Sequence, residues 1–230
     1  MSSSLTVAQT AIRDTVNSNG FTLAHECLLA QDLDALRQEF PADAESERNL
    51  FVRDSVRRMT ASPSIRVLAN AVLGPHSFAV RALFFNKTPE SNWKVAWHQD
   101  LKIAVREKFD APGFSSWSVK DGVTHVQPPD VILESMLAIR LHLDESGADN
   151  GPLRCVPGSH KSGRFANDDI LQIDKSLVVT CLAPAGSALL MRPLVVHASS
   201  SGTGGRPRRV IHLEFANTEL PNGLQWYERV

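Results

Sequence analysis

The sequence predicts a mainly β protein with flanking α-helices, built around a closed antiparallel sandwich or barrel. Two observations predict it. The first third of the chain has apolar residues at helical spacing, whereas from about residue 77 it consists of short β-branched or alternating runs. Segments such as SGADNGP (146–152) and APAGS (183–187) punctuate those runs with turn-forming residues. A length of 230 residues suits a single domain, because all-β barrels and sandwiches commonly reach that size.

Residues 1–75 are expected to be the mostly helical part. Residues 4–19 have a helical apolar period and are followed by Gly20, a typical stop; a short strand is expected at 21–28. Further helices are expected at 30–40, 46–61 and 63–73, the last closed by Gly74.

Residues 77–217 are expected to form the β core. The runs expected to be strands are 77–86, 93–100, 136–144, 153–160, 176–183, 187–199 and 208–216. The segment 107–129 breaks this rhythm, because it is long, carries aromatic residues and leaves through two prolines. Loops of that length in a compact domain are often lids or binding loops, so Trp117 and His125 become candidates for substrate contact.

Composition excludes several classes of function. Lys and Arg number 24 and Asp and Glu 25, so the formal net charge is −1 and gives no electrostatic case for nucleic acid. The three cysteines (Cys27, Cys155 and Cys181) are scattered and form no CxxC pair, which argues against a disulfide framework or a thiolate zinc site. The N-terminus has no secretory pattern, and no apolar run approaches the roughly 18 residues of a membrane span. We expect a reduced, cytoplasmic, soluble protein with a small-molecule substrate and no membrane partner; its oligomeric state has no signal in the sequence.

The stretch AWHQDLKIAV (96–105) contains the first candidate site residues. In a strand, His98 and Asp100 would project to one face, where burial is costly unless they are paired or bound to something. Two interpretations follow: a His–Asp hydrogen bond at a strand end, or two ligands of a metal site. His197, at the end of another apolar run, offers a third ligand. Two histidines and one carboxylate form the facial triad of non-haem iron(II) oxygenases, whereas structural zinc takes four protein ligands.

Four segments together carry a family resemblance. AWHQD, LAIRLHLDESGADNGPLRCVPGSHKSG, LVVHASSS and RRVIHLEFAN resemble the phytanoyl-CoA dioxygenase family of iron(II)/2-oxoglutarate oxygenases, over roughly residues 82–217. The resemblance implies a double-stranded β-helix, or jelly-roll, core wrapped by helices. It also implies that His98, Asp100 and His197 bind a catalytic iron(II), with 2-oxoglutarate and dioxygen as cosubstrates.

The distal carboxylate of 2-oxoglutarate requires a cation, and the planar guanidinium of arginine suits it better than lysine. In the family this arginine opens the strand after the distal histidine, which here is Arg208; Arg209 would point to the opposite face of that strand. The resemblance also places the hydroxyl of Ser199 near the same carboxylate, and Lys87 matches an upstream lysine that touches the cosubstrate.

The resulting hypothesis is an oxygenase that hydroxylates an unactivated C–H bond of a small metabolite and releases succinate and carbon dioxide. Arg140, in the run RLHLD, could point into the active site and meet an anionic substrate; the alternatives are a buried ion pair or a solvated face. Two rival functions stay open. One is a cupin-type dioxygenase or isomerase that uses the triad without 2-oxoglutarate, and the other is a non-catalytic jelly-roll binding protein.

Overall fold

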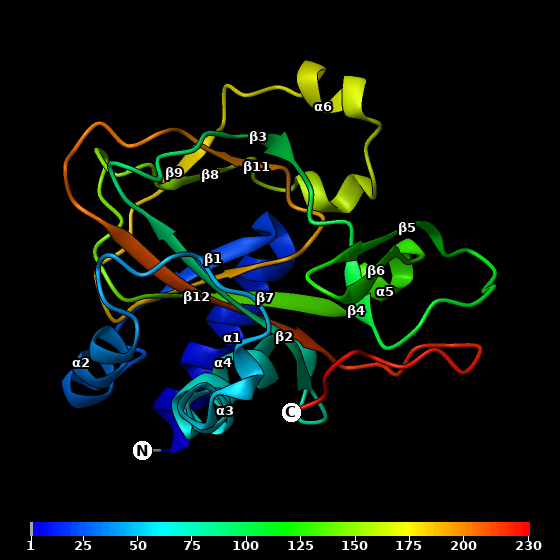
Figure 1. Ribbon diagram of the computed structural model, residues 1–230, viewed down its shortest axis with the longest axis horizontal. Helices are drawn as coiled ribbons and strands as arrows, with labels where there is room; N and C mark the ends of the chain where they lie inside the picture. Colours follow the sequence, from blue (N-terminus) through cyan, green and yellow to red (C-terminus); the bar gives the residue numbers. More distant parts are fainter. Residues whose placement is uncertain (1) are drawn as a thin grey trace.

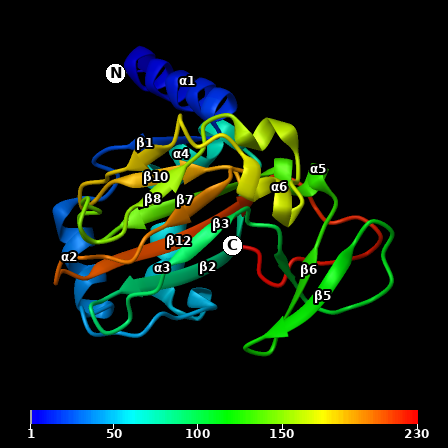
Figure 2. The same ribbon diagram turned by 90° about the horizontal axis from the view of Figure 1, so that it is seen from above.

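Two antiparallel sheets face each other in the computed structural model, which describes residues 2–230 and their side chains except those of residues 2–6 and Asn167. The major sheet has the order β1 (Phe21–Ala24), β10 (Ala188–Met191), β7 (Met136–His142), β12 (Arg208–Ala216) and β2 (Phe78–Lys87). The minor sheet has the order β3 (Val95–His98), β11 (His197–Ser199), β8 (Leu153–Cys155) and β9 (Val179–Cys181). Figure 1 shows the minor sheet above the major sheet, and Figure 2 shows it from above. The expected jelly-roll core with flanking helices is confirmed.

Helices cover the outer face of the major sheet. They are α1 (Ser2–Asn19), α2 (Ala30–Glu39), α3 (Asp54–Ala61) and α4 (Pro63–Leu73), close to the ranges predicted (Figure 1). The main hydrophobic core lies between these helices and alternate residues of the strands, such as Ile211, Leu213 and Phe215 of β12. Each of these fully buried side chains stabilises the fold by about 1.5–3 kcal/mol relative to exposure.

The same alternation turns another set of residues toward the minor sheet. On β12 these are Arg208, Val210, His212 and Glu214, and β7 adds Arg140, which is paired with His212. The side chains of all five are buried. The inner face of the major sheet is therefore partly charged, and it forms the floor of the site described below.

Two predicted elements are divided in the structure. The helix expected at 46–61 is a short 3₁₀ turn, η1 (Leu50–Val52), followed by α3, because Arg53 between them has an extended conformation. The strand expected at 187–199 is two strands, β10 and β11, in different sheets. Pro193 lies between them, and a proline cannot donate to a continuing strand ladder.

Most of the segment 107–129 is a β-hairpin, over residues 115–127, so the expectation of one long loop was wrong. Strands β5 (Ser115–Lys120) and β6 (Val123–Gln127) pair with each other and with β4 (Ile103–Val105) in a third sheet. Asp121 and Gly122 form the turn, both with positive φ, at 50° and 76°. Asp-Gly is a strong hairpin signal that the sequence offers at this point.

Short helical segments complete the chain: α5 (Asp130–Glu134), η2 (Ser159–Ser162) and α6 (Asn167–Gln172). Within residues 2–230, no helix has the length and apolar character that crossing a membrane requires.

Candidate metal centre

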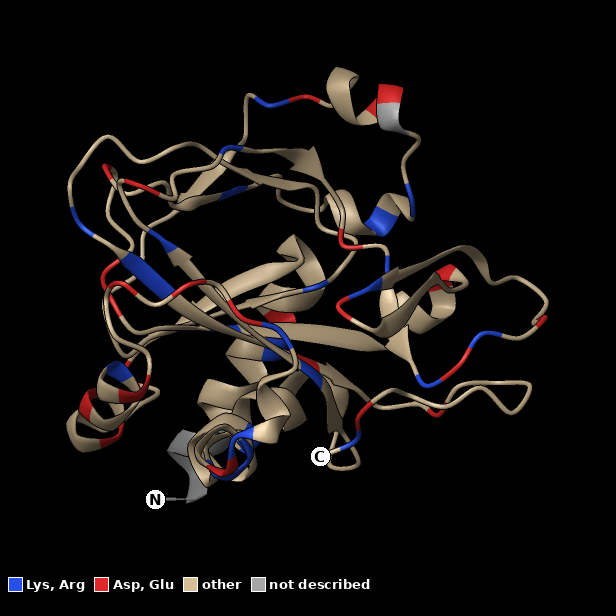
Figure 3. Cartoon of the chain, in the orientation of Figure 1, with Lys and Arg blue, Asp and Glu red and all other residues tan. Residues whose placement is uncertain are grey.

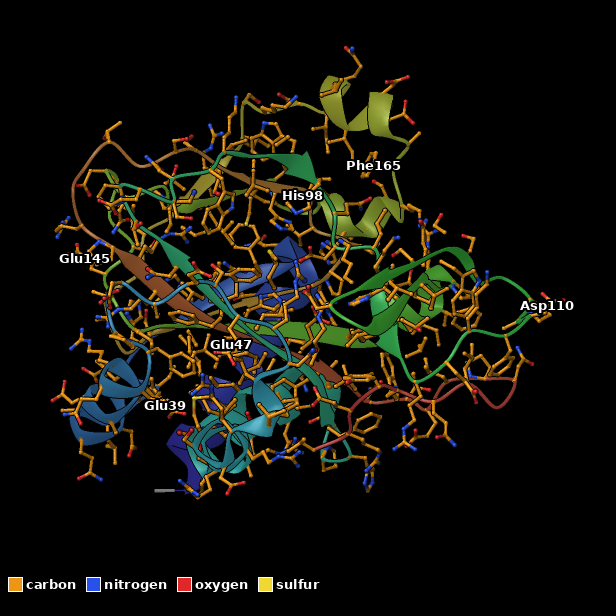
Figure 4. All side chains as sticks on the ribbon, viewed as in Figure 1. Glu39, Glu47, His98, Asp110, Glu145 and Phe165 are labelled. Atoms are coloured by element: carbon orange, nitrogen blue, oxygen red, sulfur yellow. The ribbon has the colours of Figure 1, made fainter. Side chains whose placement is uncertain are left out.

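The three expected metal ligands meet between the two sheets. His98 ends β3 and His197 begins β11, and the two are paired across the minor sheet with ring centroids 4.2 Å apart. Figure 4 labels His98 at the end of β3. The Asp100 carboxylate lies 3.7 Å from His98 Nε2 through one oxygen and 3.7 Å from His197 Nε2 through the other. The three potential ligand atoms all lie within 4.8 Å of one another.

Backbone carbonyls set the orientation of both imidazoles. His98 Nδ1 donates to the Ala96 carbonyl at 2.8 Å, and His197 Nδ1 donates to the Val195 carbonyl at 2.9 Å. Since a carbonyl only accepts, the proton of each neutral ring sits on Nδ1 and the lone pair sits on Nε2. Both Nε2 atoms face Asp100, so the triad presents two imidazole nitrogens and a carboxylate to one point.

Asp100 reaches this point from a loop, not from a strand as predicted. Strand β3 stops at His98, and residues 99–102 turn away before β4 begins. The Gln99 side chain holds the turn by donating to the Leu194 carbonyl at 2.7 Å and the Gly163 carbonyl at 2.9 Å. The Asp100 amide donates to the Pro193 carbonyl at 3.0 Å, which ties the loop to the segment leading into β11.

Charge at Asp100 and His197 matches the forms that a metal requires. At His98, burial is outweighed by the adjacent Asp100 carboxylate, which raises the pKa of the imidazole, so a metal would displace a proton there. Burial opposes ionisation of Asp100, but the adjacent His197 and His98 hold the pKa of its carboxyl below the ordinary value. Burial lowers the pKa of His197 to about 4, against the opposing effect of Asp100. Near neutral pH, Asp100 is therefore a carboxylate and His197 a neutral imidazole.

A cavity of about 220 Å³ opens beside the triad. Its walls carry charged and aromatic side chains from both sheets. The lining residues are Arg81, Leu83, Phe85, Trp93, Val95, His98, Asp100, Arg140, Leu153, His197, Ser199, Arg208 and His212. A volume of this size accommodates small metabolites rather than polymers.

Of the three predicted cosubstrate residues, Arg208 and Ser199 line this cavity, and Lys87 lies directly beside them. Lys87 on β2 is paired in register with Arg208 on β12. Lys87 Nζ donates to Ser199 Oγ at 3.2 Å and to the Ser200 carbonyl at 2.8 Å. Gly151 allows this approach, since a Cβ at that position would lie 2.4 Å from the Ser200 carbonyl oxygen and 3.0 Å from Lys87 Nζ.

Arg208 has no acidic partner among the described residues. Its side chain is buried, and among the described residues neither Nε nor Nη1 has a hydrogen-bond acceptor. Burial, with a contribution from Arg140, lowers the pKa of Arg208 to about 9, and burial with Arg208 and Arg140 lowers that of Lys87 to about 8. Arg208 and Lys87 are thus two buried cations without an anionic partner. They could bind one carboxylate of a dicarboxylate whose other end reaches the triad.

Of the three predicted substrate-contacting residues, only Arg140 lines the cavity. Trp117 and His125 do not line the cavity, because both lie in the β5–β6 hairpin. Trp117 packs against a second hydrophobic cluster. His125 is buried, and its Nδ1 donates to the Val123 carbonyl. The hairpin pairing, rather than a free loop, fixes them there.

Seven of the residues that line the cavity were not predicted from the sequence. Four of them have ionisable or aromatic side chains, namely Arg81, Phe85, Trp93 and His212. His212 could have been found from the two-residue period of its strand, because it lies four positions after Arg208 and so shares its face. Trp93 lies in the connection from β2 to β3, where no periodic signal exists.

Fold and site together define a class of protein: a jelly-roll enzyme with a facial His–Asp–His metal triad and a buried cationic pocket beside it. The profile of the phytanoyl-CoA dioxygenase (PhyH) family matches residues 16–210, most of the chain. The protein belongs to that family. It is accordingly an oxygenase, with iron as its metal and 2-oxoglutarate and dioxygen as cosubstrates.

Several solved structures share the fold of this chain. The non-heme alpha ketoglutarate dependent epimerase SnoN from nogalamycin biosynthesis has a TM-score of 0.68 and 17% identity, over 93% of this chain and 82% of that chain. EctD from S. alaskensis has a TM-score of 0.68 and 16% identity, over 91% and 76%. AviO1 from Streptomyces viridochromogenes Tue57 has a TM-score of 0.65 and 20% identity, over 93% and 96%. No curated protein sequence matches the chain.

Proposed function

We propose that this oxygenase hydroxylates an unactivated C–H bond of a small metabolite and converts 2-oxoglutarate to succinate and carbon dioxide. The observation that supports it best is the cavity in which the triad and the unpartnered Arg208 lie together. When bound, iron and 2-oxoglutarate supply dioxygen activation: one oxygen atom enters succinate and the other is inserted into the substrate C–H bond.

The residues of the chain divide the work of this reaction. His98, Asp100 and His197 would hold the metal from one side, which leaves its other side open to the cavity. Arg208 and Lys87 would bind the distal carboxylate of 2-oxoglutarate, and Ser199 positions Lys87 through its hydroxyl. This arrangement directs 2-oxoglutarate along the cavity toward the triad.

Apolar side chains complete the cavity and limit the access of water. Leu83, Phe85 and Val95 line it between the charged groups. Phe85 and Trp93 also line a second, outer hollow of about 970 Å³, so substrate would enter between these two rings. Exclusion of water protects a reactive oxidant from side reactions.

A small metabolite is the partner that this surface favours. In Figure 3, Lys and Arg are interspersed with Asp and Glu, and the first residues of β12 are basic inside the fold. Nucleic-acid binding relies on a concentrated basic face that engages phosphates. A compact cavity of about 220 Å³ supports a small substrate instead.

A turnover screen tests the proposal. The iron(II) protein with 2-oxoglutarate and ascorbate is incubated with a metabolite library, and succinate release and product mass are measured. Hydroxylation adds one oxygen atom to the substrate. Succinate release with a product of unchanged mass would indicate epimerisation, and a loss of two hydrogens would indicate desaturation or ring closure. Substrate conversion without any succinate would favour a cupin-type reaction that does not use 2-oxoglutarate.

A further inference from the structure

A line of four polar side chains crosses the inner face of the major sheet. Arg81 Nη2 lies 2.6 Å from Glu214 Oε1, and Glu214 Oε1 lies 3.3 Å from His212 Nε2. His212 Nδ1 lies 3.0 Å from Arg140 Nη1. The four residues come from β2, β12 and β7, and all except Glu214 line the cavity beside the triad.

The direction of these hydrogen bonds leaves the charge of Arg140 unmatched. A guanidinium only donates, so His212 Nδ1 is the acceptor and His212 Nε2–H donates to Glu214. His212 is thus a neutral imidazole, and burial lowers its pKa in agreement with that form. The Glu214 carboxylate is already paired with Arg81 at 2.6 Å. Arg140 is held in place by a neutral group.

The rest of the Arg140 guanidinium is unused. The residue is 8% exposed, its Nε has no acceptor, and no hydrogen bond joins Nη2 to another described residue. Its flat face lies over the Phe85 ring, 5.4 Å from the centroid. A buried cation without an anionic partner destabilises the fold. Arg140 in this state therefore indicates that a bound ligand supplies the anion.

Neither Asp100 nor the distal carboxylate of 2-oxoglutarate fills that need. Asp100 is the acidic group that favours the charged form of Arg140, and it belongs to the metal triad. The distal carboxylate is assigned to Arg208 and Lys87. Arg140 pairs with His212, four positions along β12 from Arg208, so the two backbone positions are about 13 Å apart at roughly 3.3 Å per residue. The two arginines therefore enter the cavity from different points of the sheet, although the charge of Arg140 is close enough to lower the pKa of Arg208 and of Lys87. One distal carboxylate leaves part of this positive charge unmatched.

We propose that Arg140 binds a carboxylate of the substrate, so that the enzyme acts on small carboxylic acids. This inference rests on the proposed function. Arginine binds a carboxylate through two parallel N–H donors, and Arg140 has its Nε and Nη2 free for such a pair. A carboxylate also suits the space better than a phosphate ester, because 2-oxoglutarate takes part of the 220 Å³. His212 and Glu214 are positioning residues that fix the guanidinium.

Equilibrium titration tests the inference without turnover. The anaerobic iron(II) protein is saturated with 2-oxoglutarate, whose iron chelate absorbs visible light. Straight-chain carboxylic acids of three to six carbons are then added, each compared with its primary amide, and the spectral change gives a dissociation constant. We expect at least one acid to bind tenfold or more tightly than its amide. Arg140→Gln should abolish this preference, and Arg140→Lys should retain part of it.

Arg154→Gln is the matched control. Arg154 lies on β8 of the minor sheet, over the Trp97 ring and outside the cavity lining, so its loss should leave the preference intact. No preference for any acid over its amide in the wild-type protein would overturn the inference. So would an Arg140→Gln variant whose main defect is weaker 2-oxoglutarate binding, because Arg140 would then be a second cosubstrate anchor. Failure of the proposed function looks different: no chelate spectrum would form on adding 2-oxoglutarate.

Discussion

Arg208 and Arg209 are adjacent on β12, yet their guanidinium groups lie in opposite environments. Arg209 faces the helices, where Nε and Nη2 donate to the two carboxylate oxygens of Asp144 at 2.8 and 2.7 Å and Nη1 donates to the Phe40 carbonyl at 2.8 Å. Arg208 faces the cavity, where two of its three nitrogens are buried without an acceptor. Both side chains are nearly inaccessible to solvent.

The contrast extends to the two faces of the sheet. The outer face is mostly apolar, its charged pair Arg209–Asp144 is fully hydrogen-bonded, and it stabilises the fold. The inner face contains Arg208, Arg140 and Lys87, which carry more positive charge than their neighbours neutralise. Charged groups on the inner face that lack hydrogen-bond partners are therefore candidates for ligand binding. Charged groups on the outer face whose hydrogen bonds are complete stabilise the fold.

The largest expected effect is loss of the metal. His98→Ala, Asp100→Ala and His197→Ala should each abolish iron binding and 2-oxoglutarate turnover, because a facial triad has only three protein ligands. Metal content and succinate release measure this, with circular dichroism to show that the fold persists. His76→Ala, at an exposed histidine, is the control. Full iron occupancy in any triad variant would remove that residue from the site.

The second effect separates the two arginines by function. Arg208→Met should raise the KM for 2-oxoglutarate by two orders of magnitude or more, about 3 kcal/mol at about 1.4 kcal/mol per tenfold change. The cause is that the distal carboxylate would be left buried with only Lys87 beside it. Arg209→Met should change that KM less than about tenfold, since its partner Asp144 lies on the other face. The reverse result would make Arg209 the cosubstrate anchor.

The third prediction concerns the free energy of unfolding, for which Arg209 should matter more than Arg208. Arg209→Met should lower the free energy of unfolding by about 3 kcal/mol, because Asp144 loses both charge-assisted hydrogen bonds in a largely buried setting. In the ligand-free protein, Arg208→Met should raise it by about 1 kcal/mol, because an unpaired buried cation is replaced by an apolar side chain. Urea unfolding of both variants measures the difference. Equal destabilisation by the two substitutions would contradict the assignment of Arg208 as a ligand-binding group.

The smallest effect is a pH dependence at Lys87, whose pKa burial and the cations Arg208 and Arg140 lower to about 8. Below pH 8 both the folded and the unfolded states hold the proton, so the full cost of the buried charge is present. Between pH 8 and about 10.5 the unfolded state binds more protons, so stability should rise with pH across this range.

Other groups also titrate above pH 8, so the contribution of Lys87 is obtained by comparing wild type with a variant that lacks it. The difference in unfolding free energy between wild type and Lys87→Met should shift in favour of wild type as the pH rises through that range. The affinity for 2-oxoglutarate should fall over the same range in wild type, because the ammonium that binds the carboxylate is lost, and it should be flatter in Lys87→Met. A pH-independent difference between the two proteins would show that Lys87 stays charged.

The amino-acid sequence determined much of this protein. Helical spacing and turn residues predicted the types of most elements, including the helix stops at Gly20 and Gly74, but not the hairpin of β5 and β6. The alternation of β12 predicted that Arg208 and Arg209 face opposite ways, and the family motifs predicted the three residues of the triad. These features are local: a two- or 3.6-residue period and a short motif are readable within a few residues.

Only the tertiary structure decided how distant segments meet. Asp100 reaches the triad from a loop that Gln99 anchors to Leu194, far along the chain. Arg140 and His212 are 72 residues apart in sequence and lie opposite each other because β7 and β12 are neighbours in the major sheet. Strand order and register depend on the burial of whole faces, so no local pattern reveals which polar side chains pair across a sheet and which are left for a ligand.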